Sequence, residues 1–317
     1  MKALGDAAER WLTADDPLRR QAIQALTVCT PFSSEIVGRA LDNAFSELTQ
    51  EKLSAFVSAT KLEFRPQERP VLHILPSNVF TSWLHGATLC LLMGYDVELK
   101  PSIHEPVFAP LWRESLQRVD SEWGRRVRIV KWAPEKLHGY SAVVAYGADE
   151  TLQSIRRQIP DGVSWVGYGH RFSVALVMKE AVSSARRDET LERLRLDASL
   201  FHLQGCLSPQ RVYVEGKIDW IMNGLQDLPR RPEVVAIPDL KAFVDALVSG
   251  PRKLSTIGFA GEKSRLQPFQ ATLESVGAAR LCPLGEMQKP TIAWRNGGIS
   301  LPEILGRMPL RAHSSSG

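Results

Sequence analysis

The chain contains few cysteines and no long apolar segment. Four cysteines occur in 317 residues, and no two of them form a CxxC pair or stand at metal-ligand spacing. This pattern excludes a disulfide-stapled scaffold and a zinc or thioredoxin-type cysteine motif. The longest apolar run, residues 86–95, is far shorter than the ~20 residues that cross a bilayer. We therefore expect no membrane span.

The sequence also lacks a secretory signal and a strong excess of charge. Residues 1–16 are polar and contain no apolar core, which predicts a cytoplasmic protein with reduced thiols. The formal net charge is +4, and the basic residues are scattered. Residues 125–132 resemble an edge strand, and residues 185–196 mix both signs like a solvated helix face. We expect no nucleic-acid binding, while the small positive excess suits anionic ligands such as phosphates.

Apolar strands alternate with helices through most of the chain. Residues 1–65 show helical spacing, and the pair Ser33-Ser34 is a predicted N-cap. Beyond Pro70, short apolar strands are predicted at 71–76, 95–102, 125–132, 141–147, 163–169 and 172–179. This alternation predicts an α/β fold with a doubly wound parallel sheet, which binds ligands beyond the carboxyl ends of its strands. Residues 211–285 repeat the alternation and predict a second, smaller α/β domain.

One cysteine stands apart from the other three. Cys206 lies in "FHLQGCLSPQRVYVE", at a turn between a predicted helix and a predicted strand. A structural cysteine is usually packed inside an element, where it behaves as a small hydrophobe. Cys29 and Cys90 lie in apolar helical runs and Cys282 in a strand-like run, so we expect these three in the core. Cys206 is the candidate nucleophile, provided that its site lowers the thiol pKa or supplies a base.

Polar residues follow two of the predicted strands. Asn78, in "LPSNVF", could donate its amide to an oxyanion, or it could cap the helix that follows. Lys100, in "VELKPS", ends the next strand. Its ammonium could bind a ribose hydroxyl or a 2′-phosphate, or it could be an ordinary surface lysine.

No GxGxxG fingerprint is present, although "GYGHRFS" at 167–173 approaches it. A better nucleotide candidate is "VVAYGADETLQSIR", where a strand ends at Gly147 and a helix begins near Asp149. The free N–H groups of such a helix start can bind a pyrophosphate. A simple tight turn between strand and helix explains the same residues.

The order of these signals resembles the aldehyde dehydrogenase superfamily, and more closely its LuxC-type acyl-CoA reductases. "SNVF", "LKPS", "LQGCLSPQRVYVE" with Gln204, "CPLGEMQKP" and "WRNGG" look like motifs of that family. The resemblance covers about residues 65–306. It implies a helical segment at 1–65, a cofactor-binding domain at 66–204, a catalytic domain at 205–290, and a return segment with a tail at 291–317.

By this resemblance the protein is an NAD(P)H-dependent reductase of acyl thioesters. Cys206 attacks the thioester of acyl-CoA or an acyl-carrier protein, and hydride from the nicotinamide releases an aldehyde. Asn78 serves the oxyanion, and His170 is a candidate proton relay, although it could be a plain loop histidine. The implied cofactor-binding residues are Lys100 at the adenosine ribose, Gly147 at the pyrophosphate, Glu286 at the nicotinamide ribose, and also Ser102 and Gly169. Lys100 and surrounding basic residues such as Arg126 favour NADPH, with NADH as the other possibility.

Three departures from the family pattern stand out. The water-activating Glu of the Glu-Leu-Gly-Gly-Lys motif is absent where this chain has "GYGHRFS", which fits acyl exchange with a thiol. Leu203 and Gly205 replace a Gln and an Ala before the cysteine. The chain is shorter than most relatives, mainly at the N-terminus and in the second domain, so the oligomeric state stays open.

Three other functions remain as alternatives. An aldehyde dehydrogenase working in the oxidative direction would give an acid. A non-catalytic subunit would bind an acyl ligase or a carrier protein. A cysteine hydrolase would need a paired histidine and acid, which the sequence does not reveal.

Overall fold

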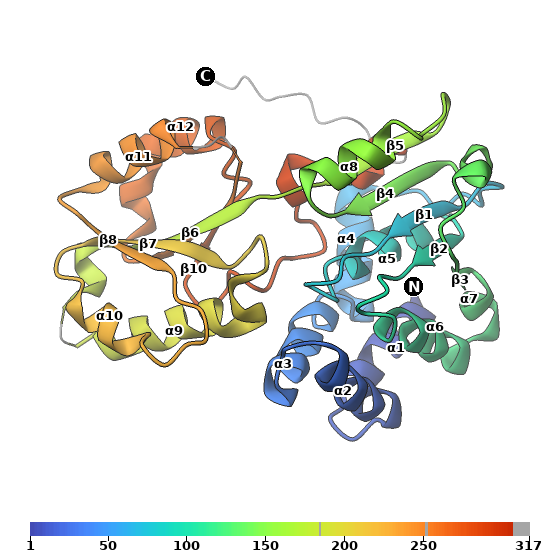
Figure 1. The fold of residues 1–317 in the computed structure, drawn as a ribbon, viewed down its shortest axis with the longest axis horizontal. Helices are drawn as coiled ribbons and strands as arrows, with labels where there is room; N and C mark the ends of the chain where they lie inside the picture. Colours follow the sequence, from blue (N-terminus) through green and yellow to red (C-terminus); the bar gives the residue numbers. More distant parts are fainter. Residues whose placement is uncertain (184, 251–252, 307–317) are drawn as a thin grey trace. The chain divides into compact units, whose positions relative to one another are not determined.

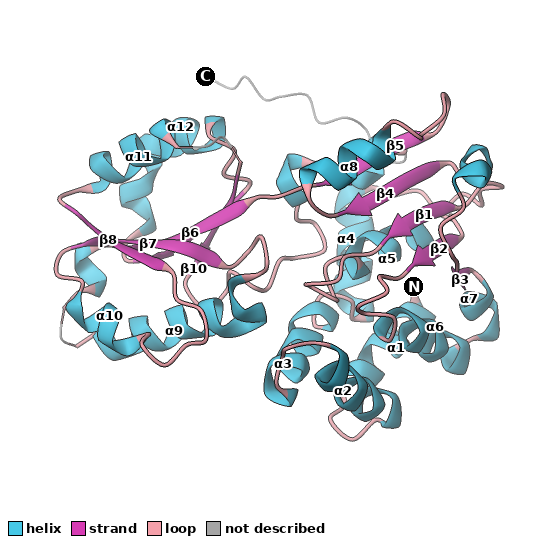
Figure 2. Cartoon of the chain, viewed as in Figure 1, coloured by secondary structure: helices cyan, strands magenta, loops and turns pink. Residues whose placement is uncertain are grey.

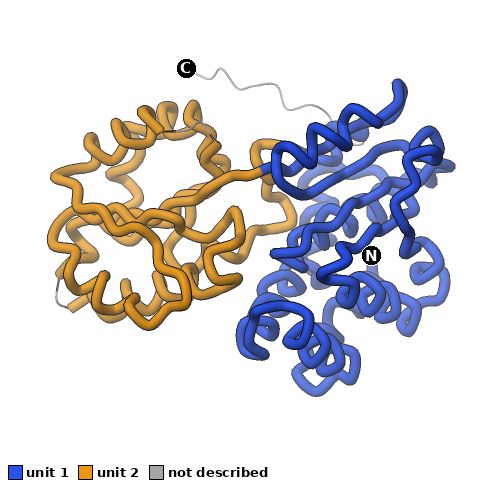
Figure 3. The backbone as a smooth tube through the Cα atoms, in the orientation of Figure 1, with its two compact units in different colours: residues 1–169, 300–317 blue, residues 170–299 orange. Residues whose placement is uncertain are grey.

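The computed structural model describes residues 1–183, 185–250 and 253–306, and the chain forms two compact units. Unit 1 comprises residues 1–169 together with the segment from residue 300, and unit 2 comprises residues 170–299 (Figure 3). The polar tail expected at the end of the chain lies outside the described residues. No helix of the described part is long and apolar enough to cross a membrane.

Four helices begin unit 1, as the sequence predicts: α1 (Lys2–Leu12), α2 (Pro17–Cys29), α3 (Ser34–Phe45) and α4 (Gln50–Thr60). The predicted cap of α3 is confirmed, because Ser33 Oγ accepts a hydrogen bond from the Ile36 N–H at 3.3 Å. Trp11 stacks on Phe45 with ring centroids 5.0 Å apart, and its indole donates to Ser115 at 2.9 Å. Because Ser115 lies on a helix of the sheet layer, the N-terminal helices share the core of unit 1.

The first sheet carries five parallel strands in the order β3-β2-β1-β4-β5 (Figure 2). They are β1 (Val71–Ile74), β2 (Val97–Lys100), β3 (Val127–Ile129), β4 (Ala142–Tyr146) and β5 (Ser164–Tyr168). The helices are α5 (Leu84–Leu92), α6 (Phe108–Val119), α7 (Ser121–Arg125), α8 (Asp149–Arg156) and α13 (Leu301–Ile304), with a 3-10 turn, η1 (Pro134–Gly139). This confirms the doubly wound parallel sheet and the edge position of β3. The strand order reverses between β1 and β4, which is where such sheets bind ligands.

The second sheet is also fully parallel, in the order β10-β9-β6-β7-β8. Its strands are β6 (Phe172–Val177), β7 (Pro209–Glu215), β8 (Glu233–Ile237), β9 (Leu254–Ala260) and β10 (Arg280–Pro283). Counted along the chain, this repeats the strand order of the first sheet. The helices are α9 (Arg187–Ser199), α10 (Asp219–Gly224), α11 (Leu240–Ser249) and α12 (Gln270–Ser275), with 3-10 turns η2 (Lys179–Ala181), η3 (Leu200–Leu203), η4 (Lys263–Phe269) and η5 (Asn296–Gly298).

Each face of the second sheet has its own core (Figure 1). Phe243 of α11 and Leu273 of α12 are buried with one set of strand side chains. Leu194 of α9 and Ile221 of α10 are buried with the other set. Both faces are therefore covered, which explains why the strands have nearly continuous apolar sequences.

The limit between the two units lies earlier in the chain than the domain limit expected from the sequence. We counted residues 172–179 with the strands of the first sheet, but β6 is the central strand of the second sheet. Its backbone pairs with β7 and β9, and the two units therefore separate after Gly169 instead of after residue 204. The pattern of residues 172–179 is that of any buried parallel strand, so only its long-range partners reveal its sheet.

Candidate functional site

Cys206 lies on a turn, residues 204–208, between α9 and β7, as the sequence predicts. The three residues before Gln204 have positive φ angles: 55° at Phe201, 49° at His202 and 58° at Leu203. Left-handed backbone is costly for residues other than glycine, and consecutive examples are held only by their surroundings. Gln210 Nε2 donates to the Leu203 carbonyl at 2.7 Å, which stabilises this approach to the turn.

A buried serine holds the peptide of the cysteine itself. Ser173 Oγ donates to the carbonyl oxygen of Cys206 at 2.6 Å and accepts from the Thr256 N–H at 3.1 Å. The side chain of Ser173 is fully buried at the start of β6, where the register of the sheet shifts before Val174. The Cys206 turn is thereby fixed to the two central strands of the second sheet.

The Cys206 thiol is half-buried, and burial raises its pKa to about 11. A hydrogen bond from the backbone N–H of Cys206 and, to a smaller extent, the charge of Arg171 oppose this effect and lower the pKa. Arg171 precedes Ser173 by two residues, which places both side chains on the same face of the extended chain. Its guanidinium packs against Gly297 of "WRNGG", where a Cβ would overlap Arg171 Nε and where φ is +60°. The Cys206 thiol is therefore protonated near neutral pH. The guanidinium of Arg171 is a nearby cation that favours its thiolate form.

Two of the other three cysteines lie in the core. Cys90 is buried on α5, and burial raises its pKa. Cys282 is buried on β10, where burial raises its pKa to about 12. Both were expected in the core, and this is confirmed. Cys29 was expected there too, but it is half-buried at the last residue of α2, where the apolar stripe of the helix ends.

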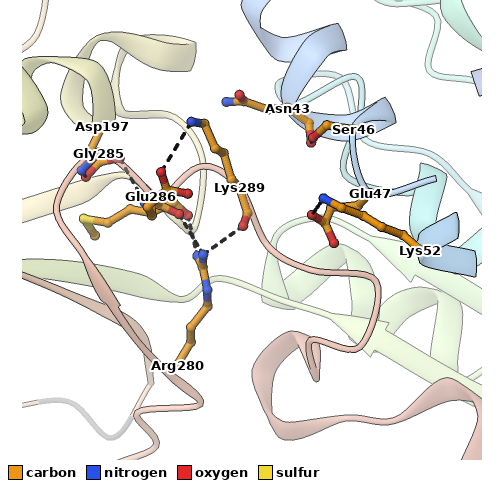
Figure 4. Close-up of polar contacts among 10 residues, drawn as sticks. Asn43, Ser46, Glu47, Lys52, Asp197, Arg280, Gly285, Glu286 and Lys289 are labelled. Carbon is orange, nitrogen blue, oxygen red and sulfur yellow. Dashed lines mark hydrogen bonds and ion pairs between the residues drawn. The ribbon is translucent and has the colours of Figure 1, made fainter. Parts of the chain in front are cut away.

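Glu286 lies on a turn after β10, residues 284–289, which we call the return turn. Its side chain is exposed, and Lys289 Nζ lies 3.5 Å from Glu286 Oε1 (Figure 4). Gly285 has a φ of +87°, which lets the chain reverse direction. Arg280, at the amino end of β10, donates to the carbonyls of Glu286 and Met287, both at 2.7 Å. The return turn therefore folds back along β10, the strand that precedes it.

His170 and Cys206 lie at the amino edge of the second sheet, since they precede β6 and β7. Sheets of this kind usually bind ligands beyond the carboxyl ends of their strands. Cys206 lies instead, as its sequence predicts, on the turn before β7, which begins at Pro209. His170 is exposed, and its role as a proton relay stays a prediction.

The predicted cofactor residues of unit 1 follow the carboxyl ends of its strands. Lys100 is the last residue of β2, and its carbonyl accepts from the Leu75 N–H at 3.0 Å. Within the described residues, Lys100 Nζ has no ion pair or hydrogen bond. Ser102 Oγ accepts from the His104 N–H at 3.2 Å and so shapes the loop after Pro101. A half-buried lysine at this edge thus has an ammonium that is available to an anion.

Asn78 lies in the loop after β1 and is exposed. Its Oδ1 accepts from the N–H of Val79 at 3.0 Å. The alternative that Asn78 caps the next helix is wrong, because α5 begins at Leu84 and its N-cap is Trp83. Its oxyanion role stays a prediction.

The two glycines at this edge differ in what surrounds them. At Gly147, after β4, a Cβ would meet Thr151 at 3.9 Å, which is ordinary contact. Packing therefore does not require a glycine there, and the backbone at the start of α8 is open to a close ligand. At Gly169, after β5, a Cβ would overlap Asp149 Oδ1 and come within 3.3 Å of Leu152. Packing against α8 is sufficient to explain Gly169.

Arg126 does not lie beside Lys100. It precedes β3, and its Nε donates to Asp96 at 3.0 Å, so it occupies the amino edge of the sheet. The basic residue at the carboxyl edge is Lys131, just after β3. The N–H of Val130 donates to the Leu99 carbonyl at 2.9 Å and so continues the pairing of β2 and β3 up to Lys131.

Sequence reasoning missed Ser173, Arg171, Asp197 and Gln288, which support the Cys206 turn and the return turn. Ser173 and Arg171 lie within "GYGHRFS", and Gln288 lies within "CPLGEMQKP". The sequence of these motifs does not indicate which residues their side chains contact. Asp197 directly follows the charged segment 185–196 and is fully buried. Among the described residues, no group of three His, Cys, Asp or Glu side chains could hold a metal ion.

Solved structures with a similar fold are aldehyde dehydrogenases. Aldehyde dehydrogenase 21 from Physcomitrella patens, in complex with the reaction product succinate, has a TM-score of 0.69 at 11% identity, over 97% of this chain and 84% of that chain. The NAD-dependent benzaldehyde dehydrogenase from Corynebacterium glutamicum has a TM-score of 0.67 at 11% identity, over 91% and 82%. Glyceraldehyde-3-phosphate dehydrogenase from Methanocaldococcus jannaschii, complexed with NADP, has a TM-score of 0.59 at 10% identity, over 93% and 81%.

The search of curated proteins returned no match. The family model described as acyl-CoA reductase (LuxC) matches residues 1–223 and 222–306, which is most of the chain. Its span includes both sheets, the Cys206 turn and the return turn. The chain therefore belongs to the family described as acyl-CoA reductase (LuxC), and its fold is similar to that of the aldehyde dehydrogenases above.

Proposed function

We propose that this protein reduces an acyl thioester to an aldehyde through an acyl-enzyme on Cys206. The observation that carries the proposal is the Cys206 turn itself. It carries a half-buried cysteine whose backbone carbonyl is held by Ser173 and whose thiolate is favoured by the charge of Arg171. Family membership supports the reaction class. The acyl donor is acyl-CoA or an acyl-carrier protein.

In the first step, the Cys206 thiolate attacks the thioester carbonyl and the carrier leaves as a thiolate. A resting pKa of about 11 means that the thiol must lose its proton on substrate binding, and the positive charge of Arg171 lowers the cost of that loss. The backbone N–H of Cys206 is the proposed oxyanion donor, together with Asn78. Because Ser173 fixes the adjoining peptide, that N–H is oriented before the substrate arrives.

A nicotinamide cofactor fits the carboxyl edge of the first sheet. Among the residues that the structure describes, none pairs with the Lys100 ammonium. At Gly147 no neighbour packs closely against the backbone at the start of α8, which leaves it open to a phosphate. When bound, the cofactor supplies the hydride that reduces the acyl carbon. We propose NADPH over NADH, because Lys100 and Lys131 place two cations at this edge. Arg126 does not support this preference, because it lies at the opposite, amino edge of the sheet and pairs with Asp96.

Asp197, the acid nearest to the Cys206 turn along the hydrogen bonds of Gln288, is not available to activate water. Asp197 is fully buried, and its two carboxylate oxygens accept backbone N–H groups at 2.6 and 3.0 Å. A carboxylate engaged in this way does not activate water. This supports thioester reduction over oxidation of an aldehyde to an acid.

The test is product analysis with dodecanoyl-CoA and NADPH, using gas chromatography, with Cys206→Ser as the control. We expect dodecanal and free CoA from the wild type, and neither from the variant. Dodecanoic acid formed from dodecanal and an oxidised cofactor would favour the dehydrogenase alternative. If neither reaction occurs and no nicotinamide cofactor binds, the protein is instead a non-catalytic subunit.

A further inference from the structure

Asp197 places a completely buried carboxyl group near the end of α9. Its Oδ2 accepts from the Gly285 N–H at 2.6 Å, and its Oδ1 accepts from the Met287 N–H at 3.0 Å. These two peptides stand on either side of Glu286, as Figure 4 shows for Gly285. Burying a carboxyl is costly unless its hydrogen bonds are satisfied. Here both oxygens are used to fix the backbone around one exposed residue.

The same segment of α9 is tied to the Cys206 turn. Gln288 Nε2 donates to the carbonyl of Asp197 at 2.9 Å and to Ser208 Oγ at 2.9 Å. Ser208 in turn closes the Cys206 turn through its N–H, which donates to the Gly205 carbonyl at 3.1 Å. A continuous set of hydrogen bonds thus joins the two turns.

Arg280 fixes the opposite side of the return turn. Its Nη1 donates to the Met287 carbonyl at 2.7 Å, and its Nη2 donates to the carbonyls of Glu286 at 2.7 Å and Lys289 at 2.8 Å (Figure 4). The backbone is therefore bound on both sides, while the Glu286 carboxylate stays exposed. Such an arrangement fixes the root of a side chain that must meet a ligand.

We propose that Asp197 is a positioning residue that sets Glu286 in a fixed relation to the Cys206 thiol. The inference rests on the proposed function, in which Cys206 carries the acyl group, and on the prediction that Glu286 binds the nicotinamide ribose. Hydride transfer requires the reacting atoms to lie about 3–3.5 Å apart. A loosened return turn therefore slows the hydride step and weakens cofactor binding more than it slows acylation.

The state of the Asp197 carboxyl depends on pH. Burial raises its pKa to about 7, while the N–H groups of the return turn and the charge of Arg280 lower it. The other titratable groups nearby are Cys282, whose pKa burial raises to about 12, and the exposed Glu286. A protonated carboxyl is a weaker acceptor for two N–H groups. The return turn should therefore loosen as the pH falls from 8 to 6.

The experiment compares Asp197→Asn with Asp188→Asn, the same change at an exposed site on α9. Three quantities are measured: amide hydrogen exchange at Gly285 and Met287, the Kd for NADPH, and the rate of acylation by dodecanoyl-CoA without cofactor. For Asp197→Asn we expect exchange and Kd to rise by about tenfold, the value of one hydrogen bond to a charged group. Acylation should change by less than about threefold, since Ser173 still holds the cysteine. From pH 8 to pH 6 the Kd of the wild type should rise more than that of Asp197→Asn, because protonation of the NADPH 2′-phosphate affects both proteins equally.

Unchanged exchange and Kd in Asp197→Asn would overturn the inference. An equal loss of acylation, binding and melting temperature would also overturn it, because Asp197 would then be merely structural. Absence of acylation in the wild type would instead refute the proposed function, and the exchange data would still test the hold on the return turn.

A second variant keeps the test informative if Asp197→Asn does not fold. Gln288→Met removes the hydrogen bonds of the return turn to the Asp197 carbonyl and to Ser208, and it leaves the two N–H bonds that the Asp197 carboxylate accepts. We expect slower NADPH oxidation in a single turnover of pre-acylated enzyme, with NADPH affinity and acylation retained. An unchanged single-turnover rate would overturn the coupling of the two turns.

Discussion

Ser173 Oγ lies 2.6 Å from the carbonyl oxygen of Cys206, and the two residues are 33 positions apart in the chain. The same hydroxyl accepts from the N–H of Thr256. One buried serine therefore connects the turn of the candidate nucleophile to β6 and β9. Its removal should affect both stability and chemistry.

Ser173→Ala leaves a buried N–H of Thr256 and a carbonyl of Cys206 without their partner. We expect the free energy of unfolding to fall by about 1–3 kcal/mol, the cost of unsatisfied buried polar groups. Acylation of Cys206 should slow as well, because its peptide is no longer fixed. Urea denaturation and intact mass measure the two effects. Ser183→Ala, at an exposed site in the same unit, is the control. Normal stability and normal acylation in Ser173→Ala would show that the hydrogen bond is unimportant.

Arg171→Met should raise the pKa of the Cys206 thiol above its value of about 11, because the charge of Arg171 lowers it. The thiolate fraction below this pKa increases tenfold for each pH unit, so alkylation by iodoacetamide should rise steadily from pH 7 to pH 10 in the wild type. At pH 8 the variant should react about 3- to 10-fold more slowly, which corresponds to a pKa rise of about 0.5–1. Arg231→Met, an exposed change in the same unit, should react like the wild type. Equal alkylation rates in the wild type, Arg171→Met and Arg231→Met would show that Arg171 does not affect the Cys206 thiol.

Asn78→Ala tests the predicted oxyanion donor. We expect acylation and reduction to slow by roughly 10²–10³-fold, the usual cost of losing one such donor. The fold should be retained, because Asn78 is exposed and lies in a loop outside the helices and strands. Stopped-flow kinetics and the melting temperature separate the two effects. Normal turnover with a lower melting temperature would make Asn78 a purely structural residue.

Lys100→Ala tests the cofactor preference. A charged hydrogen bond to a 2′-phosphate contributes about 1–3 kcal/mol, so NADPH affinity should fall about 5- to 150-fold and NADH affinity much less. Lys131→Ala should act in the same direction. Arg126→Gln is the matched control, because Arg126 lies at the opposite edge and pairs with Asp96. Equal losses for both cofactors would mean that Lys100 contacts only ribose hydroxyls.

Much of the fold follows from local sequence patterns. The alternation of apolar strands and helices predicted both parallel sheets, and Ser33 predicted the start of α3. The limit between the units did not follow, because the sheet that β6 joins depends on partners far along the chain. Cys206 was identified by its turn and its motif. Asp197 was not, since its burial depends on Gly285, 88 residues away.

The central claim is that Cys206 carries the acyl group, and intact-protein mass tests it most directly. The wild type is incubated with dodecanoyl-CoA without cofactor, alongside Cys206→Ala and Cys282→Ala. The account predicts one dodecanoyl adduct on the wild type and on Cys282→Ala, its loss on adding NADPH, and no adduct on Cys206→Ala. An adduct on Cys206→Ala, or reduction of the thioester by that variant, would contradict the account.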